Sequence, residues 1–134
     1  MNSQVVTIAK RDATSSVYLI KEGDSTFYKI GKGAKPQTRL GSLQVGNPRL
    51  LHLVSVLWVT SHETAFALEA LLHERYASYR VKGEWFNFPQ STGEIVESML
   101  HIALNNSFVL VPEELTGQDS TKRLPWTRRE VITL

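Results

Sequence analysis

Residues Ser16–Gly33 read SVYLIKEGDSTFYKIGKG, two segments of β-branched and aromatic residues separated by a polar turn. Ser16–Lys21 and Thr26–Gly31 have the composition of strands, and Glu22–Ser25 has the composition of a tight turn. This order predicts a β-hairpin. Because glycines follow closely, we expect Gly31–Ala34 to end the second strand.

The chain beyond the hairpin predicts two helices with a buried strand between them. Pro36 suits the first turn of a short helix, which Gly46–Pro48 stops. Arg49–Val59 (RLLHLVSVLWV) is apolar almost throughout, which predicts the central strand of the sheet, buried on both faces. The longest helix is expected at about residues 62–80, with Ser61 as its N-cap.

The longest helix combines an apolar stripe with a polar band beside it. At about 100° per residue, the stripe consists of Ala65, Leu68, Leu72, Tyr76 and Tyr79. The band at its rim consists of His62, Glu69, His73 and Arg80. Side chains at the rim of a buried face lie where they can enter a cleft, so this band is a candidate site.

Three further elements are predicted after this helix. Lys82–Phe88 is a turn followed by an aromatic strand, residues 94–104 form an amphipathic helix, and Phe108–Val111 is a candidate last strand. The helix is expected to bury Ile95 or Val96, together with Met99, Leu100 and Ala103. We divide the chain into an arm or edge strand at 1–14, a domain at 15–88, a helix and strand packed on it at 89–111, and a polar, basic tail at 112–134.

Length and composition are those of one globular domain, with 134 residues, 42% of them apolar and 21% charged. The absence of cysteine excludes disulfides and thiolate zinc sites, and makes a reducing cytoplasm the expected compartment. The first residues lack the apolar core of a signal peptide, and no apolar run reaches membrane-spanning length. We therefore expect no membrane partner.

Positive charge is concentrated in the first part of the chain. Residues 1–50 contain eight Lys and Arg against three Asp and Glu, whereas the other 84 residues contain seven against ten. Between positions 29 and 49 there is no acid, and the basic residues are Lys29, Lys32, Lys35, Arg39 and Arg49. Such a stretch is either a solvated surface or an electrostatic footprint for phosphate.

The order of hairpin, helix, strand and long helix resembles the GIY-YIG nuclease superfamily. The first signature of that superfamily is similar to Ser16–Tyr18, and the second is similar to Tyr28–Gly31. Arg39 follows Gly31 by eight residues, where the family has its catalytic arginine, and Glu69 falls where the family has its metal-binding glutamate. The resemblance implies an α+β fold with a small mixed or antiparallel sheet flanked by helices.

Within the superfamily, the chain looks most like the phage and bacterial orf172-type branch. That branch has Lys-Ile-Gly in the second signature, here Lys29–Gly31, and Glu-x-x-x-His on the helix, here Glu69 and His73. Its domain closes with Gly-Glu-Trp-Phe, here Gly83, Glu84, Trp85 and Phe86. The resemblance covers about residues 15–88. We expect Tyr28, Gly31 and the residues of this closing motif to be mainly structural, with Glu84 either a turn acid or a carboxylate in the second shell of the metal.

The resemblance implies a DNA endonuclease that uses a single divalent ion, Mg²⁺ or Mn²⁺, on Glu69. Arg39 would bind the non-bridging phosphate oxygens, Tyr18 would orient or deprotonate the attacking water, and His73 would order the water shell of the ion. Lys29 and Lys32 would lower the pKa of the Tyr18 phenol. With Lys35, Arg39 and Arg49 they would also bind DNA phosphates. RNA remains open as a substrate, and so does a homodimer.

Several positions have a second interpretation. Glu69 is either a metal ligand or a surface acid paired with His73 one turn along the helix, and the Tyr18 ring is either functional or a core residue. Trp85 is either part of the core or a platform for a nucleobase. Lys29 takes the tyrosine position of the second signature, which moves Tyr28 to the opposite strand face.

That exchange leaves the general base open between Tyr18 and the second signature. At the level of the whole protein, two alternatives to an endonuclease remain. One is a catalytically inactive nucleic-acid-binding module, and the other is a protein-interaction scaffold.

Overall fold

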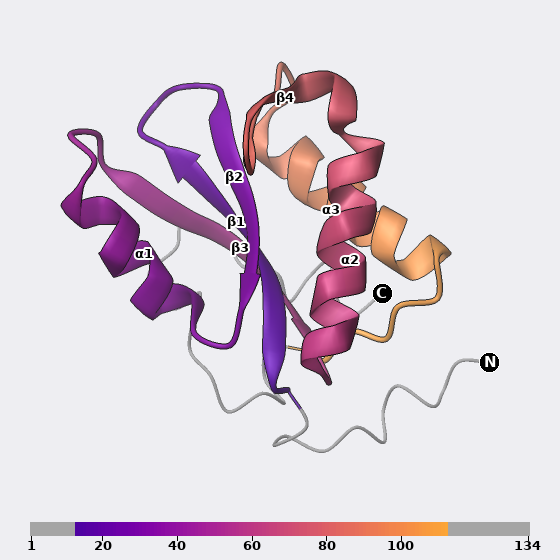
Figure 1. Cartoon of the computed structure of the whole chain (residues 1–134). Helices are drawn as coiled ribbons and strands as arrows, with labels where there is room; N and C mark the ends of the chain where they lie inside the picture. Colours follow the sequence, from indigo (N-terminus) through magenta and orange to yellow (C-terminus); the bar gives the residue numbers. More distant parts are fainter. Residues whose placement is uncertain (1–12, 113–134) are drawn as a thin grey trace.

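The structure is a computed structural model that describes residues 13–112. In this part of the chain, five strands form one antiparallel open sheet with helices on both faces (Figure 1). The elements are β1 (Ser15–Glu22), β2 (Phe27–Gly33), α1 (Pro36–Val45), β3 (Leu51–Val59), α2 (His62–Arg75), the 3-10 helix η3 (Ala77–Tyr79), β4 (Arg80–Lys82), β5 (Trp85–Asn87) and α3 (Thr92–Asn105). The predicted α+β class is confirmed. The predicted arm, apart from its last two residues, and nearly all of the predicted tail lie outside the described residues.

The predicted hairpin is confirmed as β1 and β2, which pair from Ser16 with Gly33 to Lys21 with Tyr28. Its turn has Gly23 in the left-handed region, with φ of 52°, and the Gly23 amide donates to the Leu50 carbonyl at 2.7 Å. The prediction that Gly31–Ala34 ends the second strand is confirmed, although β2 extends two residues beyond the predicted segment Thr26–Gly31. Pairing continues to Gly33, because the Ser16 hydroxyl donates to the Gly33 carbonyl at 2.6 Å and holds the last pair together.

The prediction that Arg49–Val59 is the central strand is wrong. The sheet order is β3-β1-β2-β5-β4, so β3 lies at an edge, although its burial on both faces is confirmed. The outer edge is covered because the Val111 amide donates to the Trp58 carbonyl at 2.9 Å. This single bridge is all that forms of the predicted strand Phe108–Val111. An apolar run in the sequence indicates that both faces of a strand are covered. It does not indicate whether that strand lies at the centre or at the edge of the sheet.

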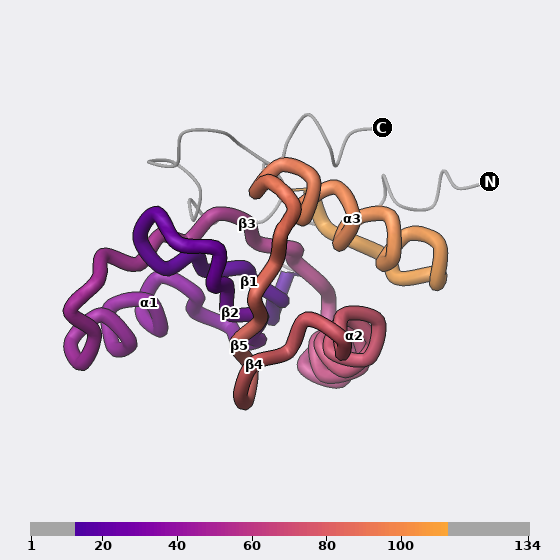
Figure 2. Tube along the Cα trace, turned by 90° about the horizontal axis from the view of Figure 1, so that it is seen from above, coloured from indigo at the N-terminus to yellow at the C-terminus, as the bar shows by residue number. Residues whose placement is uncertain are grey.

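Helices cover the two faces of the sheet separately. Figure 2 shows α1 on one side and α2 with α3 on the other. Strand alternation assigns each β1 residue to a side. Val17 and Leu19 belong to the core cluster with α2 and α3, whereas Tyr18 and Ile20 belong to the cluster that Leu40 of α1 packs against. We call these the α2 face and the α1 face of the sheet.

The long helix begins as predicted and ends earlier. The Ser61 hydroxyl accepts a hydrogen bond from the Thr64 amide, which confirms the N-cap. The helix stops at Arg75 rather than near residue 80, because the Tyr76 ring packs edge-on against Phe88 at 5.0 Å and the chain then turns. Arg80 consequently lies in β4 and not on the helix band with Glu69.

The last helix is longer than predicted. A capping box of Ser91 and Glu94 begins α3 at Thr92, and the helix continues to Asn105. Both Ile95 and Val96 are buried, so the prediction of one or the other was too narrow. None of the helices within residues 13–112 combines the length and the apolar character needed to cross a bilayer.

Gly31 is required by a close approach within the hairpin. A Cβ at this position would lie 2.7 Å from the Tyr18 hydroxyl oxygen and 2.8 Å from two ring carbons, closer than nonbonded atoms tolerate. The Tyr18 ring therefore lies directly over the Gly31 backbone, its partner in the sheet register. The glycine serves this contact and not a strand-to-helix turn.

Gly31→Ala should destabilise the protein by about 1–3 kcal/mol, because the buried Tyr18 ring has to move. Urea unfolding measures the effect. Gly41→Ala is the matched control, since a Cβ there meets no heavy atom within 4 Å and a helical alanine should stabilise by up to about 1 kcal/mol. In a Tyr18→Ala background the cost of Gly31→Ala should largely disappear. Unchanged stability of Gly31→Ala in the natural background would contradict this packing.

Candidate functional site

The candidate site lies beside β2, next to the point where the neighbouring strand β5 begins. β5 pairs with β2 only from Phe27 to Lys29. The Ile30 amide donates to the Glu84 carbonyl at 3.0 Å, and the chain reverses at Gly83, whose φ is 58° as expected for the predicted turn. The freed Ile30 carbonyl accepts from His73 Nε2 of α2 at 2.9 Å. Side chains from three distant parts of the chain meet here.

Glu69 is the most unusual side chain of the site. It lies on the buried side of α2 with 8% of its surface exposed. Its Oε1 atom is 3.5 Å from Lys32 Nζ, whereas its Oε2 atom is buried without a hydrogen-bond partner. Burial and then the charge of Glu84 raise the pKa of Glu69, and Lys32 and His73 oppose this only in part. The carboxylate is therefore incompletely compensated by its surroundings.

Glu84 and Lys29 form the opposite case, a compensated pair. Their Oε1 and Nζ atoms are 2.5 Å apart, and the Lys29 side chain is buried. Burial alone would raise the pKa of Glu84, but the hydrogen bond and charge of Lys29 lower it below its ordinary value. Lys29 is consequently committed to a protein carboxylate, which reduces its availability for the predicted phosphate contact.

Tyr18 points its phenol across Gly31 toward the site. Burial raises the pKa of Tyr18, the Arg39 charge and hydrogen bond lower it, and Glu84 and Glu69 raise it further, with a net increase. The prediction that Lys29 and Lys32 lower this pKa is wrong, because burial prevails and the cation that opposes it is Arg39. The interpretation of Tyr18 as a core residue is confirmed, since its ring belongs to the core, and the catalytic part of its hydroxyl stays a prediction.

Tyr28 lies outside the site, as its shifted position predicted. It is buried on the α2 face, its hydroxyl is 2.5 Å from the Thr92 hydroxyl, and its ring packs edge-on against Phe88 at 5.8 Å. Phe86 is fully buried in the same cluster, so its predicted structural part is confirmed. Trp85 is only half-buried, on the α1 face.

His73 has a clear structural partner. Its Nε2–H group donates to Ile30, and its ring meets Phe86 edge-on at 5.0 Å between centroids. These two contacts hold the ring against the core at the edge of α2. Its charge also lowers the pKa values of Glu69 and Glu84, which places it close to both carboxylates.

The predicted phosphate-binding residues divide into two groups. Lys32, Lys35 and Arg39 lie near the Gly33 end of the hairpin and are exposed. Arg49 pairs with Glu22 at 3.9 Å, at the turn end of the hairpin. Since Ser16 and Glu22 are six residues apart on β1, the two groups are separated by about 20 Å.

One exposed residue at the rim was not predicted from the sequence. Phe66 is 62% exposed, one turn before Glu69, and Lys32 Nζ lies 5.5 Å from its ring centroid. Its spacing of three residues from Glu69 is a weak signal, because a helical phenylalanine is more often assigned to the core.

The donor set of the site fits one hard divalent ion. Such an ion binds through one carboxylate together with waters and substrate oxygens, so Glu69 with its unpartnered Oε2 atom can hold it. Within residues 13–112 there is no group of three or more His, Cys, Asp or Glu side chains arranged as a complete metal cage. The fit is therefore to a water-rich site and not to a closed structural one.

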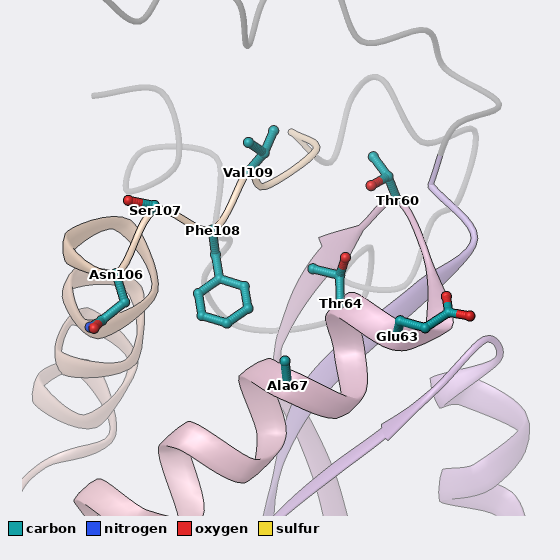
Figure 3. A pocket seen from close by; sticks show the side chains of 8 residues that line it. All are labelled: Thr60, Glu63, Thr64, Ala67, Asn106, Ser107, Phe108 and Val109. Atoms are coloured by element: carbon teal, nitrogen blue, oxygen red, sulfur yellow. The ribbon is translucent and has the colours of Figure 1, made fainter.

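A separate hollow of about 420 Å³ contains none of these residues (Figure 3). It lies between the first turns of α2 and the segment after α3, and its described lining includes Glu63, Thr64, Asn106 and Phe108. Glu63 is the single titratable side chain of that described lining. The hollow lacks the paired acids and bases that mark the β2 site.

Comparison with known families gives one match. The model of the T5orf172 domain matches residues 15–103, about two thirds of the chain, from β1 through most of α3. No curated protein and no solved structure matches the chain. The matched range contains every residue of the β2 site. The chain therefore belongs to the T5orf172 domain family, a family associated with nuclease-like, DNA-binding domains.

Proposed function

We propose that this protein is an endonuclease of the GIY-YIG type, which hydrolyses phosphodiester bonds of DNA with one Mg²⁺ or Mn²⁺ ion. The observation that supports the proposal best is the buried Glu69 carboxylate with its unpartnered Oε2 atom. Lys32, Tyr18 and Arg39 surround the same place. Family membership supports the nuclease class in general.

A buried carboxylate without full compensation costs stability. A structural role would be served better by a neutral or apolar residue, because Glu69 lies among core residues of α2. A cation bound to Oε2 would remove the cost. The acid is thus explained by a bound cation, and the surrounding bases are explained by a polyanionic substrate.

When bound, the ion would lower the pKa of a coordinated water and neutralise charge that develops on the phosphate. The exposed Arg39 guanidinium is suited to two non-bridging oxygens at once. Because its pKa is raised, the Tyr18 phenol keeps its proton near neutral pH and acts as a hydrogen-bond donor that orients the water or the phosphate. Lys32 and Lys35 would hold the adjacent phosphates.

Glu69→Gln should reduce the cleavage of plasmid DNA by roughly a thousandfold, because loss of the ion removes several kcal/mol of transition-state stabilisation. Nicked and linear products are measured with Mg²⁺, with Mn²⁺ and without either. Glu74→Gln is the matched control, an exposed glutamate on the same helix. Cleavage by Glu69→Gln at the rate of the control would exclude Glu69 as the metal ligand.

Glu69→Gln should also stabilise the protein at pH 7 without metal, by on the order of 1 kcal/mol. A raised carboxyl pKa means that the folded protein binds the proton more tightly than the unfolded chain, so stability is lost as pH rises through the folded pKa. The advantage of the variant should therefore shrink as the pH falls through the raised folded pKa, and it should be lost below the ordinary carboxyl value of about 4.5.

Thermal unfolding across this pH range measures the difference. Mg²⁺ should raise the Tm of the natural protein and not of the variant. A variant that is less stable than the natural protein at pH 7 without metal would show that Glu69 is well compensated.

Tyr18→Phe should lose most of the activity and keep its fold, because the ring stays in the core and only the hydroxyl at the site is lost. Tyr28→Phe should keep its activity and lose about 1 kcal/mol of stability, the usual net value of a hydrogen bond such as that to Thr92. Rates from pH 6 to about pH 10 and urea unfolding separate the two. If Tyr18→Phe kept its activity and Tyr28→Phe lost it, the catalytic role would belong to the second signature and not to Tyr18.

A further inference from the structure

A second concave place lies on the α1 face of the sheet, beside the candidate site. It is a pocket of about 330 Å³ between β2, β4, β5 and the loop after α1. Its described lining is Glu22, Phe27, Asn47, Val81, Lys82 and Trp85. Phe27 and Val81 are exposed apolar side chains, which soluble proteins seldom gather in a hollow without a ligand.

Trp85 lies between two lysines in a row that crosses three strands. The sheet register pairs it with Lys29 of β2 on one side and with Lys82 of β4 on the other. Side chains directly opposite each other have Cβ atoms about 5 Å apart, so both cations flank the indole. Lys29 is neutralised by Glu84, whereas Lys82 has no ion pair within residues 13–112.

The pocket and the candidate site are joined along one face of β2. Phe27 lines the pocket, Lys29 follows it on the same face, and Gly31 supports the Tyr18 phenol. Phe27 and Gly31 are four residues apart, or about 13 Å along a strand. A nucleic acid strand bound at the site therefore needs to extend by only a few nucleotides to reach the pocket.

We propose that this pocket binds an unpaired nucleobase of the DNA strand held at the candidate site. The inference rests on the proposed function and adds its substrate class, DNA that is single-stranded or locally unpaired. Base stacking on an indole with a flanking lysine for the phosphate is the chemistry of single-strand binding. The lining acid Glu22 does not oppose it, because Arg49 lies 3.9 Å from its carboxylate.

Tryptophan fluorescence reads the pocket directly. Trp58 is fully buried and Trp126 lies outside the described residues, so a Trp126→Phe background makes Trp85 the responsive indole. The protein carries Glu69→Gln and is titrated without divalent ion, so that no DNA is cut. A single-stranded oligodeoxynucleotide should quench the emission, and the same sequence as a blunt duplex should quench it much less.

Binding of fluorescein-labelled single strands, measured by anisotropy, tests the same pocket without relying on Trp85 emission. Val81→Asp, at a position 58% exposed, should weaken binding at least about fivefold through loss of stacking and repulsion of phosphate. Val109→Asp is the matched control, 44% exposed in the separate hollow, and should bind like the natural protein. Trp85→Phe should keep the affinity that Trp85→Leu loses.

The outcomes separate this inference from the proposed function. Quenching and Val81 dependence, together with no cleavage by the natural protein in the presence of Mg²⁺ or Mn²⁺, would support the pocket and reject the nuclease. Metal-dependent cleavage together with equal quenching by single strand and duplex, or with unchanged binding by Val81→Asp, would overturn the pocket alone. Absence of DNA binding in both assays would also overturn the proposal of a nucleobase pocket. The pocket would then bind an apolar side chain of another protein or remain empty.

Discussion

Strand register in the β1–β2 hairpin is the constraint on which the rest of the structure depends. Because side chains alternate between the two faces, the pairing of Tyr18 with Gly31 decides which residues meet at the site. A slip by one residue would turn one of the two strands over, placing either Val17 on the α1 face or Lys29 on the apolar α2 face. Gly31 prevents such a slip in practice, since any larger residue opposite Tyr18 would meet its ring.

The electrostatics of the site follow from this register. Lys29 lies on the α1 face and forms an ion pair with Glu84. Lys32 lies on the α2 face, and its ammonium group is paired with the Oε1 atom of Glu69. One acid is therefore compensated and the other is not. The ion pair of Lys29 thus has a structural consequence, because it ties β2 to the turn that precedes β5.

Local patterns were sufficient for much of the fold. The hairpin, α1 and the Ser61 cap depend on residues close in sequence, and the resemblance to a nuclease family implied that Arg39 and Glu69 belong to one site. Features that depend on contacts between residues far apart in the chain could not be predicted from the sequence. The edge position of β3 depends on Val111, and the end of α2 depends on Phe88. The raised pKa of Tyr18 depends on burial of its side chain, which the spacing of residues in the sequence does not indicate.

One strand carries both the proposed chemistry and the proposed recognition. Gly31 and Phe27 stand on the same face of β2, with Lys29 between them, so a rigid ladder and not a loop sets the distance from the phenol to the aromatic pocket. A loop would let that distance vary, and a strand that pairs with β1 from Tyr28 to Gly33 and with β5 from Phe27 to Lys29 does not. The side chains around the pocket can therefore change, as Val81 and Lys82 on the exposed β4 edge permit, without moving Tyr18.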